Sequence, residues 1–123
     1  MADVNAVVDG YIAMWNETSP ERRRAIIADV WTHDASYLDP MMEGEGHAGI
    51  DAMVAGAQQQ FPGHRFELSQ GPDAHHDRVR FAWELGQEGG SPLAGGVDFG
   101  VLAGDRLEAI TGFLDFASSA NWQ

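Results

Sequence analysis

The stretch "AGGVDFGVLAGDRLEAITGFLDF", residues 94–116, decides the fold class. Apolar and polar residues alternate through both halves, which is typical of β-strands, and Gly104-Asp105 between them is a tight-turn signal. Residues 78–85 alternate in the same way. Apolar side chains at helical intervals predict helices over three segments: residues 3–16, 20–31 and 50–61. This order predicts an α+β fold with its helices on one face of a curved antiparallel sheet.

Length and charge limit the class of protein. The 123 residues suffice for one domain with its own core, so a single domain over residues 1–123 is expected. The formal net charge of −12 would repel nucleic acid and anionic membranes. The absence of cysteine excludes disulfides, thiol nucleophiles and thiolate metal ligands. With no signal-peptide pattern and no membrane-length apolar run, we expect a cytoplasmic protein that binds neither nucleic acid nor membrane.

A glycine-rich segment, Gly44-Glu45-Gly46-His47-Ala48-Gly49, matches the G-x-G-x-x-G pattern of dinucleotide-binding loops. That motif requires its first glycine directly after a strand of a βαβ unit. Here Gly44 comes five residues after Asp39, and Glu43 and Glu45 would place carboxylates against phosphates. We interpret the segment as a loop that leads into the third helix. The histidines form no spaced ligand pair on one face, so neither a metal nor a cofactor is expected.

Four polar residues occupy positions where the apolar pattern predicts burial. Tyr11 lies on the stripe of the first helix, Asp39 ends the strand "ASYLD", Asp98 is central in "GGVDFGV", and Asp115 is in "GFLDF". A buried carboxyl group must be paired or stay neutral, so such positions are candidate functional sites. Each also has an ordinary structural interpretation, as a core tyrosine or as an aspartate that forms a turn before proline.

The segments "FPGHRFEL" and "GGVDFGVLAGDRLEAITGFLD", with the order of the first elements, resemble the SnoaL-like branch of the nuclear transport factor 2-like superfamily. The resemblance spans nearly the whole chain. It implies a cone-shaped α+β barrel, in which three N-terminal helices pack on a curved mixed sheet around one pocket. Members include polyketide cyclases, limonene epoxide hydrolase and ketosteroid isomerase. The resemblance therefore implies a small apolar or carbonyl-containing ligand and no cofactor.

Three segments, "AVVDGYIAMWN", "ASYLDP" and "GGVDFGVL", are similar to those that carry the site of ketosteroid isomerase. The resemblance assigns the oxyanion-hole tyrosine to Tyr11, the catalytic base to Asp39 and the protonated aspartic acid to Asp98. Proton abstraction next to a carbonyl would serve an isomerase or a polyketide cyclase, because both begin from an enolate. Epoxide opening is disfavoured, because Gly96 stands where the epoxide hydrolase has an arginine. Asp115 is the candidate for the aspartate that acts with a histidine in the cyclases.

The last predicted strand also bears on pocket and assembly. The pocket is expected to be lined by six large apolar side chains: Trp15, Met41, Met53, Phe61, Trp83 and Phe113. The strand carries apolar residues on both faces, with Ile110, Leu114 and Phe116 on one and Leu107, Ala109 and Phe113 on the other. Because helices cover only one face, we predict a homodimer through the sheet. A non-catalytic ligand-binding or dimerisation module with the same cone remains the alternative to an enzyme.

Overall fold

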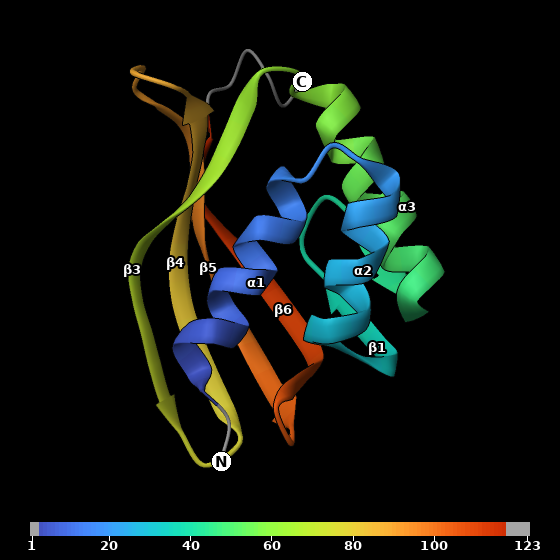
Figure 1. Ribbon diagram of the computed structural model, residues 1–123. Coiled ribbons are helices and arrows are strands. Elements are labelled where there is room, and N and C mark those ends of the chain that lie inside the picture. The colour runs from blue at the N-terminus through green and yellow to red at the C-terminus, as the bar shows by residue number, and fades with distance from the viewer. Residues whose placement is uncertain (1–2, 118–123) are drawn as a thin grey trace.

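The helices come first along the chain and the long strands last (Figure 1). The structure is a computed structural model that describes residues 3–117. Its helices are α1 (Val4–Asn16), α2 (Pro20–Val30) and α3 (Gly46–Gln60). Its strands are β1 (Trp31–Leu38), β2 (Glu43–Glu45), β3 (His64–His75), β4 (Arg78–Gln87), β5 (Pro92–Ala103) and β6 (Arg106–Ala117). The predicted α+β order is confirmed, but the loop predicted at residues 44–49 is wrong, because β2 includes Gly44 and α3 already begins at Gly46.

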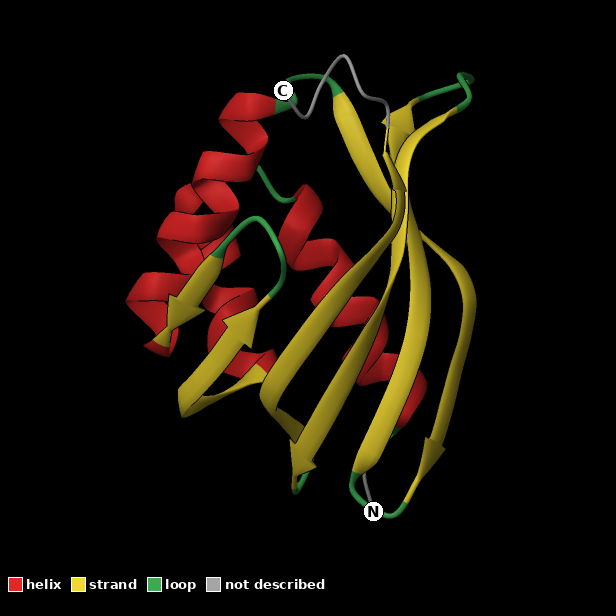
Figure 2. Ribbon diagram, turned by 180° about the vertical axis from the view of Figure 1, so that it is seen from behind, coloured by secondary structure: helices red, strands yellow, loops and turns green. Residues whose placement is uncertain are grey.

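The strands form a mixed sheet in the order β2-β1-β6-β5-β4-β3. All neighbours are antiparallel except β1 and β6, which pair in parallel. The sheet curves around one side of the helices and does not close, so β2 and β3 are its edges (Figures 1 and 2). Register shifts in β3 near Gln70 interrupt its pairing with β4, and such irregularities allow a strand to bend. The result is an open cone with the helices on its inner side, as the family resemblance implied.

Local signals in the sequence fix where the first two helices begin. The side chain of Asp3 accepts a hydrogen bond from the backbone N–H of Ala6 at the start of α1. Ser19 caps α2 in the same way, and Pro20 occupies its first turn, where a missing N–H costs nothing. The α2 helix ends at Val30, so Trp31, expected in the helix, is instead the first residue of β1. None of the described helices is long and apolar enough to cross a membrane.

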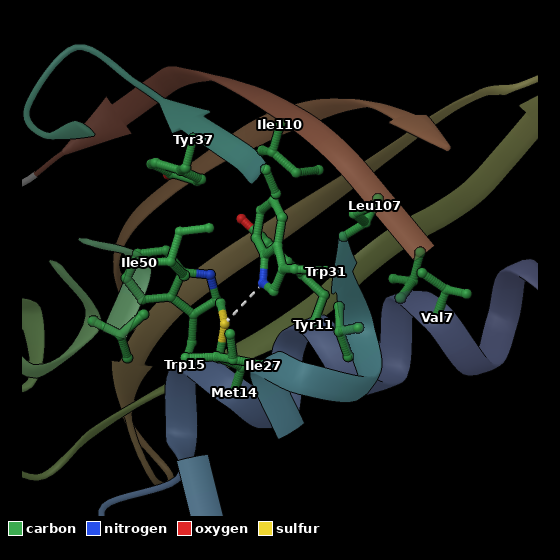
Figure 3. Close-up of a cluster of buried hydrophobic side chains, with 14 of the residues drawn as sticks. Val7, Tyr11, Met14, Trp15, Ile27, Trp31, Tyr37, Ile50, Leu107 and Ile110 are labelled. Atoms are coloured by element: carbon green, nitrogen blue, oxygen red, sulfur yellow. Dashed lines mark hydrogen bonds between the residues drawn. The ribbon is translucent and has the colours of Figure 1, made fainter. Parts of the chain in front are cut away.

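The main core lies between α1 and the inner face of the sheet (Figure 3). Tyr11, Met14 and Trp31 are fully buried there, and the indole N–H of Trp31 lies 3.2 Å from the sulfur of Met14. The ring of Tyr11 makes edge or tilted contacts with Trp31 and Phe81. These contacts hold α1 in one rotation about its axis, with the Tyr11 hydroxyl turned toward the sheet.

Strand β6 departs from the strict alternation that the sequence predicted. Its register with β5 shifts around Glu108, so Leu107 and Ile110 are both buried although they were expected on opposite faces. A second shift near the end of β6 leaves Phe116 exposed, together with Phe113. An extra residue in one strand exchanges the faces of all residues that follow it, and apolar spacing alone does not reveal it.

Candidate active site

A narrow apolar cavity lies between α1, the end of α3 and the inner face of the sheet. Aromatic rings form much of its wall, and the polar groups that reach it are the side chains of Tyr11, Tyr37, Asp39 and Asp98. The space open to the centre of a water molecule is about 30 Å³. A cavity of this size holds a few waters or one small ligand group.

Asp98 is the buried acid of the cavity. It lies in β5 with 2% of its surface exposed. Its Oδ2 accepts a hydrogen bond of 2.7 Å from the Tyr11 hydroxyl, and its Oδ1 accepts one of 3.1 Å from the indole N–H of Trp83. Burial, with a smaller contribution from the charge of Asp39, raises the pKa of Asp98 to about 6, against the effect of these two donors. Asp98 therefore changes its protonation state near pH 6.

Asp39 follows directly after β1 and is held by a turn. Its Oδ1 accepts hydrogen bonds from the backbone N–H groups of Met41 at 2.7 Å and Met42 at 2.9 Å. Its backbone N–H donates to the carbonyl of Met42, and the Tyr37 hydroxyl donates to Oδ2. The turn interpretation of Asp39-Pro40 is thus correct, and the same turn fixes the carboxylate at the cavity.

Two tyrosine hydroxyls act as donors to the two acids. Burial, followed by the charge of Asp98, raises the pKa of Tyr11 and the pKa of Tyr37 above their ordinary range. Both hydroxyls therefore keep their protons. The sequence did not single out Tyr37, although a signal was present: Tyr37 and Asp39 are two residues apart, and such residues share one face of a strand.

Gly112 on β6 creates the space in which the acids meet. It pairs with Asp98 across the sheet. A Cβ atom at Gly112 would lie 2.7 Å from Oδ1 of Asp98, 3.2 Å from Cβ of Asp39 and 3.5 Å from the Tyr37 hydroxyl. Asp39, Asp98 and Tyr37 therefore converge on one point that only glycine leaves open. Glycine inside a strand often marks such a close approach, but the sequence does not say to which groups.

The aromatic side chains form a continuous row along the cavity wall. The ring of Trp15 lies 5.6 Å from that of Tyr37 and 5.0 Å from that of Phe66, between ring centroids. Phe66 continues the row to Trp83 at 5.6 Å. The rings are tilted by 42° to 64° relative to their neighbours, so they enclose the cavity from several directions.

The structure brings together most of the predicted site residues, and their chemical roles stay predictions. Seven of them line the cavity: Tyr11, Trp15, Asp39, Met41, Phe61, Trp83 and Asp98. The other three predicted site residues, Met53, Phe113 and Asp115, do not line this cavity. Met53 lies in the main core, while Phe113 and Asp115 are exposed on β6 because the residues between and before them, Leu114 and Gly112, point inward.

Solved structures with the same architecture identify the fold. A hypothetical protein with a ketosteroid isomerase-like fold from Catenulispora acidiphila DSM 44928, solved in complex with trimethylamine, has a TM-score of 0.72 at 15% identity, covering 94% of this chain and 87% of that one. A candidate polyketide cyclase from Sinorhizobium meliloti has a TM-score of 0.68 at 13% identity, covering 87% and 93%. At these identities the likeness shows the fold alone, which is the nuclear transport factor 2-like cone.

A further solved structure is similar in sequence as well as in fold. A protein of the SnoaL-like family from Agrobacterium tumefaciens str. C58, described as a candidate isomerase, is 42% identical, with a TM-score of 0.85 over 90% of this chain and 96% of that one. The chain therefore belongs to the SnoaL-like family. No protein-family model and no curated protein matches the sequence.

Proposed function

We propose that the protein is an isomerase that moves a proton within a small carbonyl compound through an enolate. The observation that carries this proposal is the meeting of Asp39, Asp98 and two tyrosine hydroxyls beside Gly112 in an apolar cavity. Enolisation needs a base for the carbon acid and donors for the oxygen that becomes negative. Both kinds of group are present within one small space.

Asp39 is the base in this proposal. Its carboxylate removes a proton from the carbon next to the carbonyl and returns it to a second carbon, so the reaction has no net loss of atoms or electrons. Tyr11 and the protonated form of Asp98 donate to the carbonyl oxygen while the enolate exists. In the free protein the Tyr11 hydroxyl donates its hydrogen bond to Asp98. When substrate binds, the same hydroxyl would donate to the substrate oxygen instead. Apolar surroundings strengthen such hydrogen bonds.

The size of the cavity favours an isomerase over a polyketide cyclase. A cyclase also starts from an enolate, but it must then fold a long chain to join two carbons. The cavity has little free space, about 30 Å³ for the centre of a water molecule. A compact substrate with a single reacting unit is therefore the better fit.

Conversion of cyclohex-3-en-1-one to cyclohex-2-en-1-one tests the proposal, because the conjugated product absorbs ultraviolet light that the substrate does not. Asp39→Asn should lower kcat by roughly 100-fold or more, the usual contribution of a general base. Tyr11→Phe should lower kcat, with circular dichroism checking that the variant folds. Since Asp98 must be protonated, kcat/KM should fall as the pH rises through about 6.

Asp115→Asn is the matched comparison, because this acid lies on the exposed side of β6. It should retain full activity, and a loss would restore the role that the family resemblance assigned to Asp115. Turnover of the ketone that survives Asp39→Asn would show that the base is another group. No turnover of this or related small enones, combined with altered stability in the variants, would favour the non-catalytic binding module.

A further inference from the structure

The cavity holds two carboxyl groups, from Asp39 and Asp98, and no positively charged side chain lines it among residues 3–117. We propose that the cavity also binds small alkylammonium cations, which compete there with a carbonyl substrate. The inference deepens the proposed function, and it rests on that function only in using the same cavity. Charge, ring arrangement and size each support it separately.

Most of the protein's own cations are engaged away from the cavity. The chain has seven basic residues, all arginines, against nineteen acidic residues. Six of the arginines form ion pairs away from the cavity: Arg22, Arg23, Arg24, Arg78, Arg80 and Arg106. The donors that reach Asp39 and Asp98 are hydroxyl, indole and backbone N–H groups, all of them neutral. A formal net charge of −12 also raises the local concentration of cations around the protein.

The rings of Trp15, Tyr37, Phe66 and Trp83 add a second source of attraction. Neighbouring rings in this row lie 5.0–5.6 Å apart and are mutually tilted, so their faces do not stack flat on one another. Aromatic faces carry partial negative charge, and several of them around one space are the usual means of recognising alkylated ammonium groups. Asp39 beside Tyr37 and Asp98 beside Trp83, at the two ends of this row, supply the full charge that balances the cation.

The space and its rim suit a small head group. The narrow interior has room for a compact ammonium group and not for a fused ring system. Met41 and Met42 also line the cavity, and Met41 is 48% exposed. Flexible methionines adapt to differently shaped ligands, so a short tail on the cation can pass them toward solvent.

The protonation state of Asp98 decides whether the cavity favours a cation or a carbonyl compound. The titratable groups that face Asp98 are Tyr11 from α1, Tyr37 from β1 and Asp39 after β1. Both tyrosines keep their protons, and Asp98 gains or loses its own near pH 6. The ionised form of Asp98 attracts a cation, whereas the protonated form offers a donor to a carbonyl oxygen. Cation affinity should therefore rise with pH as carbonyl turnover falls.

Choline and its uncharged carbon isostere, 3,3-dimethylbutan-1-ol, are the matched probes. Titration followed by the indole N–H signals of Trp15 and Trp83 in NMR spectra should show saturable binding of choline at pH 7.5. The affinity for the isostere should be lower by about tenfold or more, since the isostere fills the same space without charge. Choline affinity should be about tenfold lower at pH 5, where Asp98 must first lose a proton.

The variant Asp98→Asn should weaken choline binding at pH 7.5 and remove its dependence on pH between 5 and 7.5. The pH dependence of the unmodified protein tests the inference even if this variant does not fold. Equal binding of choline and the isostere, or no binding of choline at 100 mM, would overturn the inference. Ketone turnover would then still stand on its own, and choline binding without any turnover would instead refute the isomerase.

Discussion

Burial of Asp98 changes how the stability of the protein responds to pH. Its pKa rises from an ordinary value of 3.8 to about 6, mainly because the charged form is removed from water. The folded state therefore binds this proton more tightly than the unfolded state. It follows that the contribution of Asp98 to stability is most favourable below pH 4, declines as the pH rises to about 6, and stays lower above that.

Asp98→Asn should isolate this effect, because the amide oxygen can still accept a hydrogen bond from Tyr11 but carries no charge. Relative to the unmodified protein, the variant should gain about 2 kcal/mol in free energy of unfolding when the pH is raised from 4 to 7. Urea unfolding of both proteins at the two pH values measures the difference. An identical effect of the substitution at pH 4 and pH 7 would show that Asp98 is not protonated preferentially in the folded state.

Gly112 is a second residue at which a small change should affect stability, because an added Cβ atom has no space there. In Gly112→Ala the new methyl group would lie 2.7 Å from Oδ1 of Asp98, so one of the acids must shift. We expect a cost of about 1–3 kcal/mol in free energy of unfolding, typical of an added methyl group without space.

Gly56→Ala is the matched control for that substitution. Gly56 is exposed within α3, and a Cβ atom there meets nothing within 4 Å. Alanine should stabilise the helix by about 0.5–1 kcal/mol, because it restricts the unfolded chain more than glycine does. Thermal unfolding of both variants gives the comparison. If Gly112→Ala leaves the stability unchanged, the two acids are not confined by β6.

At the scale of elements, a buried arginine joins the three helices. Arg23 on α2 donates from Nε to Asp51 on α3 at 2.6 Å and from Nη1 to the backbone carbonyl of Glu17 at the end of α1. Nη1 also donates to the side chain of Gln58, whose amide group in turn reaches Glu17 and Trp15 backbone carbonyls. This network fixes the helices on which Tyr11 and the cavity wall depend.

Arg23→Ala should destabilise the protein by about 3 kcal/mol, because it leaves Asp51 half-buried beside an empty space with only the more distant Arg24 as partner. Arg22→Ala provides the control one residue earlier on the same helix. Arg22 pairs with Glu17 but its side chain is 73% exposed, so its loss should cost less than about 1 kcal/mol. Equal losses in chemical denaturation would show that the buried network does not hold the helices together.

Helices and strands differ in how well the sequence predicted them, for a physical reason. The start of α2 depends on Ser19 and Pro20, which act within one turn, and its prediction is confirmed. The face that each residue of β6 presents depends instead on pairing with β5, which a bulge near Glu108 shifts. Alternation could place Asp98 inside the cone, but it could not exclude Phe113 and Asp115.

At the scale of the whole molecule, the cavity depends on contacts between distant parts of the chain. Tyr11 and Asp98 are 87 residues apart and meet because α1 packs across the sheet. The family resemblance predicted that these two residues share one site. Patterns along the chain could only mark each residue as unusual for its position. The sequence does not distinguish Tyr37 from other core tyrosines or Gly112 from other strand glycines. Their importance depends on neighbours that only the folded structure shows.

The outer face of the sheet leads to the remaining prediction, which concerns assembly. No described helix lies in front of this face in Figure 2. Phe99 on β5 and Phe113 on β6 are about half exposed there, and their rings are in edge contact 5.8 Å apart. Covering these exposed rings with a second copy would remove apolar surface from water, which favours association.

We therefore predict a homodimer through this face, with a mass in light scattering twice the 13.3 kDa of the chain. Phe113→Glu places a charge within the apolar cluster and should shift the protein to monomers at micromolar concentration, while its helical content stays unchanged. Ala52→Glu adds the same charge on the exposed side of α3 and should leave the dimer intact. If the unmodified protein is monomeric at 100 µM, the aromatic cluster serves another purpose. Asp98 and Phe99 are adjacent on β5 and face opposite sides of the sheet. A dimer contact at Phe99 would therefore also restrict the motion of the strand that carries the buried acid.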